Sequence, residues 1–304
     1  MSAILKVLKP LSITNAVLQS SNVPENDYTE YSLTIPYALG DRVIVAADHS
    51  IYESLAAANL GNVPSSSPLK WVKVSATNRW KMFDSSNTTA TTKSSSIVVT
   101  LIPGQVINAV GFVNVQGASV RVQMNDSVDG LVYDKTVTLQ APPDNANWYS
   151  YFFDEIKYIT SAKFTALPSY RNATLTITIN PVPNKAASCG TCLIGKTVEI
   201  GRGIRRGAQV GITDYSRKER NSWGDITLVQ RAYSKKSTIS MLLNKKEVDY
   251  LNESFFPSIR AMPTLWIGGD TYDSMTIFGI YKDFSITIQY ASLAECSLEI
   301  EGLT

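Results

Sequence analysis

Alternation of apolar and polar residues, repeated along much of the chain, is the feature that most restricts its fold. In ASVRVQM, the apolar residues Val120, Val122 and Met124 occupy every second position. ATLTITIN and CSLEIEGL repeat the pattern, and FSITIQY continues it through Ile288 to Tyr290. Because successive side chains of a β-strand point to opposite faces of a sheet, each run predicts a strand with one buried face. The chain is therefore predicted to be mainly β.

One segment has helical spacing instead. Val248, Leu251 and Phe255 recur at intervals of three and four residues, which places them on one face of a helix. Asn244 stands at the cap and Glu247 three residues later, the arrangement of a capping box. Pro257 is expected to limit this helix, because proline lacks the backbone N–H that continues it. We expect the helix to cover one face of a sheet.

Loop chemistry divides the chain into three predicted domains. Residues 1–75 are expected to form a small β module. Residues 76–185 carry repeated alternating strands with turn signals such as the DG pair, which is typical of a β-sandwich. NPVPNKAAS then reads as a linker, because a central strand does not tolerate its prolines. Residues 189–304 are predicted to form an α+β domain that contains the helix.

Composition and charge argue against some partners. Apolar residues make up 44% of the chain and charged residues 18%, as in globular proteins. The formal net charge is only +2, whereas a general nucleic-acid binder needs a strongly basic surface. Lys6, Lys9 and Pro10 interrupt the apolar N-terminal run, which falls short of the ~20 apolar residues of a membrane helix. We expect no nucleic-acid partner, no membrane insertion and no export signal.

Motifs for catalysis or for a bound group are weak. Cys189 and Cys192 have the CxxC spacing of redox centres and half zinc sites, but they precede a strand-like run, so packing is favoured and their role stays open. GRGIRRG (201–207) departs by one residue from the dinucleotide fingerprint. His49, the only histidine, is expected at an exposed turn, without marked triad partners. We expect no catalytic residue, no cofactor and no metal, in a protein that is not an enzyme.

Residues of the first predicted domain are spaced in a recognisable way. The pattern is a YxxGDxV segment, a second tyrosine, a proline and a tryptophan: Tyr37, Gly40, Asp41, Val43, Tyr52, Pro64 and Trp71. It resembles the small chitin- and cellulose-binding modules of the type 5/12 carbohydrate-binding family. The resemblance implies a small sheet packed around aromatic residues, with Tyr37, Tyr52 and Trp71 as candidate glycan contacts. Family members place exposed rings after the second tyrosine, where this chain has alanines at 56–58.

A longer succession of segments resembles the tail-tip and baseplate structural proteins of tailed bacteriophages. It runs YALGDRVIVAADHSIYESL, NRWKMFD, WYSYFFDEI, CGTCLIGKTVEIG and DYSRKERNSWGDITLVQRAYSKK. The resemblance implies a virion component of the tail, made in the host cytoplasm. Such a protein acts by assembly with other phage tail proteins, as a homo-oligomer in a ring. The alternative is a carbohydrate-binding adsorption protein that contacts host surface glycan.

A locally basic segment, residues 196–220, supplies candidate subunit contacts. These are Arg202, Arg205, Arg206 and Arg217. Guanidinium groups bind carboxylates of a neighbouring subunit well and are enriched at interfaces. Asp214 and Glu219 interleave with them, so pairing within the chain stays open as an alternative.

Overall fold

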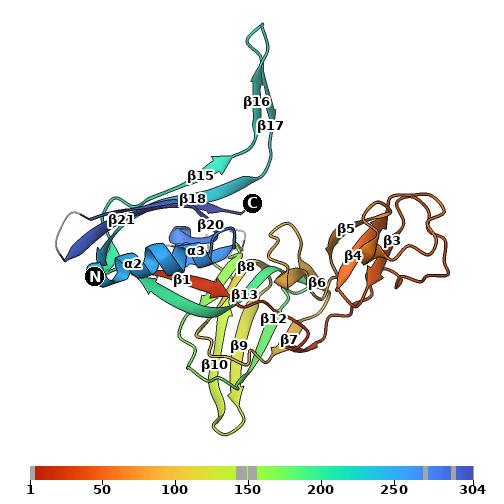
Figure 1. Ribbon diagram of the computed structural model, residues 1–304, viewed down its shortest axis with the longest axis horizontal. Helices are drawn as coiled ribbons and strands as arrows, with labels where there is room; N and C mark the ends of the chain where they lie inside the picture. Colours follow the sequence, from red (N-terminus) through yellow and green to blue (C-terminus); the bar gives the residue numbers. More distant parts are fainter. Residues whose placement is uncertain (1–3, 142–148, 150–155, 270–272, 289–291, 304) are drawn as a thin grey trace. The chain divides into compact units, whose positions relative to one another are not determined.

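The protein is mainly β, as predicted, and its strands gather in two compact units. The computed structural model describes residues 4–141, 149, 156–269, 273–288 and 292–303. Unit 1 contains the chain up to Leu11 and from Leu193 onward, whereas unit 2 is Ser12–Cys192. Figure 1 shows the elements of both units. Among the described residues, no helix has the length and apolar character needed to cross a membrane.

This division differs from the three predicted domains. Strand β1 (Leu5–Pro10) pairs with β13 (Ala187–Ile200) and with β19 (Thr264–Ile267), so the first strand joins the C-terminal part of the chain. Strand β13 begins inside the predicted linker and continues through the CGTC motif. Pairing between segments far apart in sequence leaves no trace in local loop chemistry, which explains the different boundaries.

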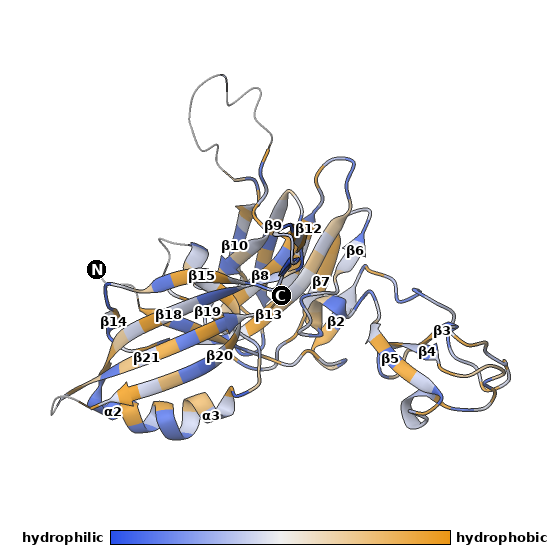
Figure 2. Ribbon diagram, turned by 90° about the horizontal axis from the view of Figure 1, so that it is seen from above, coloured by the Kyte–Doolittle hydropathy of each residue, from blue (hydrophilic) through white to orange (hydrophobic). Residues whose placement is uncertain are grey.

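Unit 1 is built on an antiparallel sheet. The order of its strands is β13-β1-β19-β20-β21-β18-β14, and β15 also pairs with β18. The other strands are β14 (Gly203–Ile204), β15 (Gln209–Asp214), β18 (Tyr233–Asn244), β20 (Thr276–Thr287) and β21 (Leu293–Gly302), and a short 3-10 turn, η4 (Asp273–Met275), precedes β20. The predicted alternation in β21 is confirmed: Cys296, Leu298 and Ile300 are buried, and Figure 2 shows β21 banded in alternating hydropathy.

The predicted end of β20 is too late. The strand stops at Thr287, and Ile288 is 72% exposed. Ile288 continues the apolar alternation but lies outside β20, because the pairing of β20 with β21 ends at Thr287. Tyr290 lies outside the described residues.

A helical segment covers one face of this sheet. It consists of α2 (Lys245–Asp249), the π-helical η3 (Tyr250–Phe255) and α3 (Phe256–Ser258). The predicted capping box is confirmed: the backbone N–H of Asn244 donates to Glu247 Oε2 at 2.9 Å. The segment ends one residue past Pro257, because the proline stands in the first turn of α3, where a missing N–H is tolerated.

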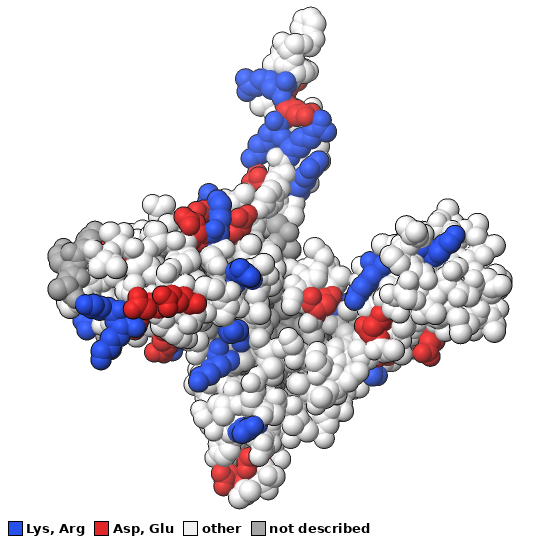
Figure 3. All heavy atoms as spheres, in the orientation of Figure 1, with Lys and Arg blue, Asp and Glu red and all other residues white. Residues whose placement is uncertain are grey.

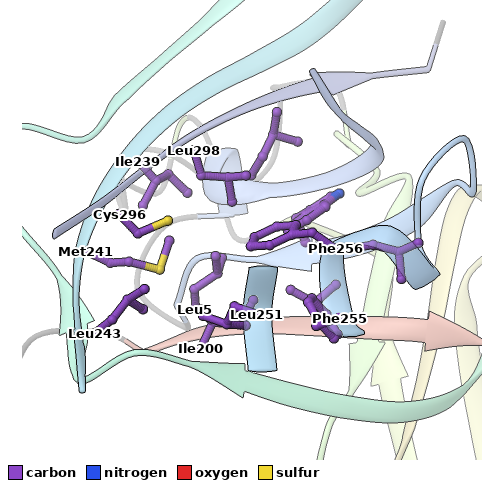
Figure 4. Close-up of a cluster of buried hydrophobic side chains, with 14 of the residues drawn as sticks. Leu5, Ile200, Ile239, Met241, Leu243, Leu251, Phe255, Phe256, Cys296 and Leu298 are labelled. Carbon is purple, nitrogen blue, oxygen red and sulfur yellow. The ribbon is translucent and has the colours of Figure 1, made fainter. Parts of the chain in front are cut away.

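The core of unit 1 lies between this helical segment and the sheet. Figure 4 shows Leu251 and Phe255 directed toward the buried side chains of the strands, among them Met241 and Cys296. Phe256 is fully buried and stacks on Phe284, with ring centroids 4.1 Å apart. Aromatic pairs in such close contact stabilise a core beyond the area that they bury.

Unit 2 contains two further sheets. One has the order β10-β9-β12-β7-β2, and the other is the small sheet β3-β4-β5. Their strands are β2 (Leu18–Ser21), β3 (Arg42–Val45), β4 (Ser50–Ser54), β5 (Trp71–Ala76), β7 (Ile97–Leu101), β9 (Ser119–Asp126), β10 (Gly130–Thr138) and β12 (Thr174–Asn180). The unit also holds β6 (Thr91–Lys93), β8 (Ala109–Gln116), β11 (Ser161–Phe164), and the short 3-10 turns η1 (Pro64–Ser66) and η2 (Lys81–Phe83).

The alternation predicted for unit 2 is confirmed in its five-stranded sheet. Val120, Val122 and Met124 of β9 are buried, and so are the alternate apolar residues of β12. The DG pair closes the hairpin between β9 and β10, where Gly130 has a φ of 72°. In the segment WYSYFFDEI, residues 148 and 150–155 lie outside the described residues.

Candidate functional site

The three candidate glycan contacts lie in the core of the small module, which comprises residues 28–76 and the sheet β3-β4-β5. Tyr37 is 6% exposed, Tyr52 7% and Trp71 2%. The ring of Trp71 meets that of Tyr37 edge to face, with centroids 5.2 Å apart, and its indole N–H donates to the Asn62 carbonyl at 2.8 Å. Val43 is buried beside them, as the sequence predicts. These rings fill a very small core, and their burial leaves no ring face exposed on which a sugar could stack.

Tyr52 has a second role in the module. Its hydroxyl donates to Asp48 Oδ2 at 2.6 Å. Burial, reinforced by this hydrogen bond and by the carboxylate charge, raises the pKa of Tyr52 to about 12. Both effects favour the neutral phenol, so the hydrogen bond persists well above the pH at which a free tyrosine ionises.

The large apolar side chains exposed on the module are mainly aliphatic. Leu39 is 67% exposed and Leu69 is 89% exposed. Within residues 28–76, Tyr28 is the one exposed aromatic side chain, at 40%. The turn that carries Ala57 and Ala58 is exposed and offers no ring. Aliphatic side chains of this kind fit a protein surface better than the face of a sugar.

His49 holds the module to its neighbours in the chain. Its Nδ1 lies 2.8 Å from Glu25 Oε1, and its Nε2 lies 2.7 Å from Asn15 Oδ1. The imidazole stacks on Trp80 with centroids 4.2 Å apart. Glu25 also accepts a hydrogen bond of 2.8 Å from Thr77. The expectation of an exposed turn residue is therefore corrected: His49 is in a turn, but these contacts leave it partly buried.

An open hollow of about 330 Å³ adjoins His49. Its lining includes Asp48, Lys73 and Asp84. Asp48 accepts the Tyr52 hydroxyl, and Asp84 accepts the Ser86 backbone N–H and the Thr89 hydroxyl. Burial raises the pKa of Asp84 above its ordinary value. The carboxylates at this hollow thus serve to hold the loops around it.

The CGTC cysteines are packing residues of β13. Cys189 and Cys192 are buried and free. Burial raises the pKa of Cys189 to about 12 and that of Cys192 well above its ordinary value. Since the thiolate is the form that reacts and binds metal, neither side chain is poised for redox chemistry. No group of three or more His, Cys, Asp or Glu side chains within the described part of the chain is arranged to hold a metal ion.

The four candidate arginines lie between β13 and β16 (Arg217–Arg220) of unit 1 or at the start of β16. Arg205 pairs with Glu295, and Arg217 Nε lies 2.5 Å from Glu219 Oε1. Arg202 Nε donates to the Asn244 side chain at 2.6 Å, and Arg206 is exposed in the turn before β15. Pairing within the chain, the alternative left open by the sequence, is thus present for Arg205 and Arg217. Exposed ion pairs contribute little stability, so a partner could displace them.

A hairpin arm, residues 215–232, extends from the edge of the unit 1 sheet. It carries β16 (Arg217–Arg220) and β17 (Ile226–Val229), which pair only with each other. Figure 1 shows this arm rising from the ends of β15 and β18. All residues of both strands are exposed. The arm therefore has no core of its own.

The register of the arm separates two faces. Lys218 lies opposite Leu228, and Arg220 lies opposite Ile226. Residues directly opposite each other in an antiparallel pair point to the same side, so these four form one apolar and basic face. Ile226 is 54% exposed and Leu228 is 69% exposed. Figure 3 shows basic side chains gathered along the arm, below an uncharged tip.

The tip of the arm presents a tryptophan. Trp223 is 89% exposed. The turn that carries it is ordered, because Asn221 Oδ1 accepts the backbone N–H groups of Trp223 at 3.0 Å and Asp225 at 2.9 Å. Gly224 supplies the positive φ of 93° that the turn requires. Neither the basic residues nor the resemblance of this segment to tail proteins predicts the arm, although two short strand-like runs around NSWGD are the signal of such a hairpin.

A second open hollow, of about 580 Å³, lies at the base of the arm. Its lining is Tyr215, Arg231, Ala232, Ile280, Glu301, Gly302 and Leu303. The Tyr215 hydroxyl donates to Glu301 Oε1 at 3.0 Å. The hollow thus combines an aromatic ring and aliphatic side chains with one cation and one carboxylate.

Comparisons with known proteins add little to this description. No protein-family model matches the sequence, and no curated protein matches it. A similar solved structure is a chitosan-binding module derived from a chitosanase/glucanase of Paenibacillus sp. IK-5. It is 11% identical, has a TM-score of 0.26, and the match covers 38% of this chain and 82% of that chain. A likeness at this level carries no weight for function.

Proposed function

We propose that this chain is a structural component of a phage tail tip or baseplate and that it works by protein–protein assembly. The hairpin arm carries this proposal. Its strands leave Ile226 and Leu228 largely exposed, and its tip leaves Trp223 almost fully exposed. Contiguous apolar surface on a protein with its own core is typical of a contact site, and an isolated two-stranded hairpin is marginal in water. The arm is therefore expected to be completed by another protein.

The order of sequence segments supplies the class of assembly. Their resemblance to tail-tip and baseplate proteins motivates a virion location, with other tail proteins as partners. The aliphatic surface of the small module, with Leu39 and Leu69 exposed, also fits contact with protein. We propose synthesis in the host cytoplasm followed by incorporation into the tail, without a catalytic step.

Host-glycan binding receives less support. The three rings that the alternative needs are core residues of the module, and stacking on a sugar requires an accessible ring face. Saturable binding of the purified protein to host polysaccharide would restore that alternative. Glycan binding that survives unfolding of the small module would place the sugar site elsewhere in the chain.

The virion proposal is tested on particles. Mass spectrometry of purified virions would detect this protein. Electron microscopy with an antibody against it would locate it on the particle. We expect several copies per particle, with label at the tail end. Purified, infectious particles without the protein would overturn the proposal.

A further inference from the structure

We propose that Trp223 of one copy inserts into the hollow at the base of the arm of a second copy. This proposal rests on the proposed assembly function and names one contact through which that assembly would form. The donor is the arm tip, and the acceptor is the hollow lined by Tyr215, Arg231, Ala232, Ile280, Glu301, Gly302 and Leu303. The partner is thus a second copy of this chain.

The donor is prepared for binding. Trp223 is 89% exposed, and the backbone around it is fixed by the Asn221 side chain. Tryptophan is enriched among residues that dominate binding energy, because an indole buries a large area. An ordered turn lowers the entropy lost when the side chain is immobilised. An indole held out in this way has no partner within its own hairpin.

The acceptor has chemistry that suits an indole. Ile280 and Leu303 supply aliphatic surface, and Arg231 supplies a cation that can lie over an aromatic face. Glu301 supplies a carboxylate that can accept the indole N–H. The hollow is open to solvent and has a volume of about 580 Å³, so an indole would lie against its wall with one edge exposed. Together these groups recognise both the ring and its polar edge.

The arm cannot fill the hollow of its own copy. Pairing of Arg217–Arg220 with Ile226–Val229 keeps the hairpin extended. Trp223 follows Tyr215 by a length of strand that spans roughly 25 Å. The tip of the arm therefore stays far from its own base, and only the arm of another copy can reach the hollow.

Charge is also complementary along the two surfaces. Arg220 lies near the tip, on the face that carries Ile226. On the acceptor, Glu299 and Glu301 alternate with buried residues of β21 and so point outward beside the hollow. Glu299 is paired with Lys282 at 3.1 Å, an exposed contact that an incoming arginine can share. The same docking thus places a basic strand near an acidic one.

The contact is heterologous, because donor and acceptor are different surfaces of the chain. Each copy would give its tryptophan to one neighbour and receive that of another. Repetition of such a contact closes into a ring or grows into a filament, according to the rotation between copies. The two surfaces can therefore be disabled separately.

The test uses one donor variant and one acceptor variant of the full chain. Trp223→Ala removes the indole and keeps the hollow, whereas Ala232→Arg fills the hollow and keeps the tip. Val128→Ala is the matched control, since Val128 is 87% exposed at the turn between β9 and β10. Sedimentation velocity over a concentration series measures association, and thermal unfolding confirms that each variant is folded. Leu303→Arg replaces Ala232→Arg if that variant does not fold.

We expect the wild type and Val128→Ala to associate equally. Each of the other variants is expected to weaken association by roughly 30-fold or more, as for an interface hot spot. An equimolar mixture of Trp223→Ala and Ala232→Arg should form a species of two chains and nothing larger, because only one working contact remains.

Two results would overturn this contact. One is that Trp223→Ala associates at the same protein concentration as the wild type. The other is that the wild type stays monomeric throughout the concentration series. Either result leaves the virion proposal standing if the protein is found in purified particles. Absence from particles removes the assembly function itself, so the two failures are distinguishable.

Discussion

The small module and the hairpin arm are both minimal β structures, but they place their aromatic side chains in opposite ways. The module encloses Tyr37, Tyr52 and Trp71 within three strands. The arm has two strands and holds Trp223 in solvent. A small sheet gains stability either from enclosed aromatic bulk or from another surface. The module takes the first route, and we propose that the arm takes the second.

This difference separates stability from binding. Substitutions in the module should change unfolding, whereas substitutions in the arm should change association. The expected loss of unfolding free energy is largest for the core of the module and smallest for the arm.

Trp71→Ala should destabilise the module most. It removes a side chain that is 2% exposed and leaves a cavity, which typically costs about 3–5 kcal/mol of unfolding free energy. Hydrogen exchange of the β3, β4 and β5 amides measures the effect locally. Val72→Ala is the control, because Val72 is 42% exposed on the next position of β5. Equal protection in both variants would contradict a core role for Trp71.

Glu25→Gln should destabilise the joint around His49. The substitution removes the charge that His49 and Thr77 contact at 2.8 Å, and hydrogen bonds to a charged group are worth about 1.5–3 kcal/mol. Denaturant unfolding of the full chain measures the loss. The exposed Glu30 provides the control Glu30→Gln, for which a change of similar size would argue against a specific joint.

Tyr52 should make the stability of the module depend on alkaline pH. Its folded pKa is raised from the ordinary value of 10.0 to about 12, so the unfolded phenol ionises first. The contribution is complete below pH 10 and is lost as pH rises toward 12. Tyr52→Phe should lose about 1.5 kcal/mol at neutral pH, the lower end for a hydrogen bond to a carboxylate, and show a shallower decline above pH 10. A parallel decline in both proteins would show that Tyr52 does not cause it.

Ile226→Ser combined with Leu228→Ser should barely change unfolding. Both side chains are more than half exposed, and surface substitutions usually stay within about 0.5 kcal/mol. Association of the same variant should nevertheless weaken, because the apolar face of the arm is lost. A clear drop in melting temperature at low protein concentration would mean that the arm packs on its own chain.

Local patterns in the sequence account for much of this fold. Alternation places Val120 and Leu298 in sheet cores, and the capping box marks the start of the helix, because strand faces and helix caps are decided within a few residues. The packing of Val43 with Trp71 is also predictable, since so small a sheet has few residues to bury. These features depend on neighbours in sequence.

Features that depend on distant partners could not be predicted in the same way. His49 is an ordinary turn residue by sequence, and its burial comes from Asn15 and Glu25. The hollow at the base of the arm needs Arg231, from the link between β17 and β18, and Glu301, from β21. The exposure of Trp223 does not follow from its residue type, because an isolated tryptophan is more often buried, and only the surrounding hairpin places it in solvent.

The pairing of β1 has a consequence for the order in which the protein matures. Both neighbours of β1 are synthesised much later than β1 itself, because Leu5 pairs with Ile200 and Lys6 pairs with Ile267. At ordinary ribosome speeds this delay lasts on the order of tens of seconds. Residues 12–192 emerge whole during that interval. The arm follows them, so its exposed tip is made shortly before β18, β19, β20 and β21, which complete the sheet that carries it.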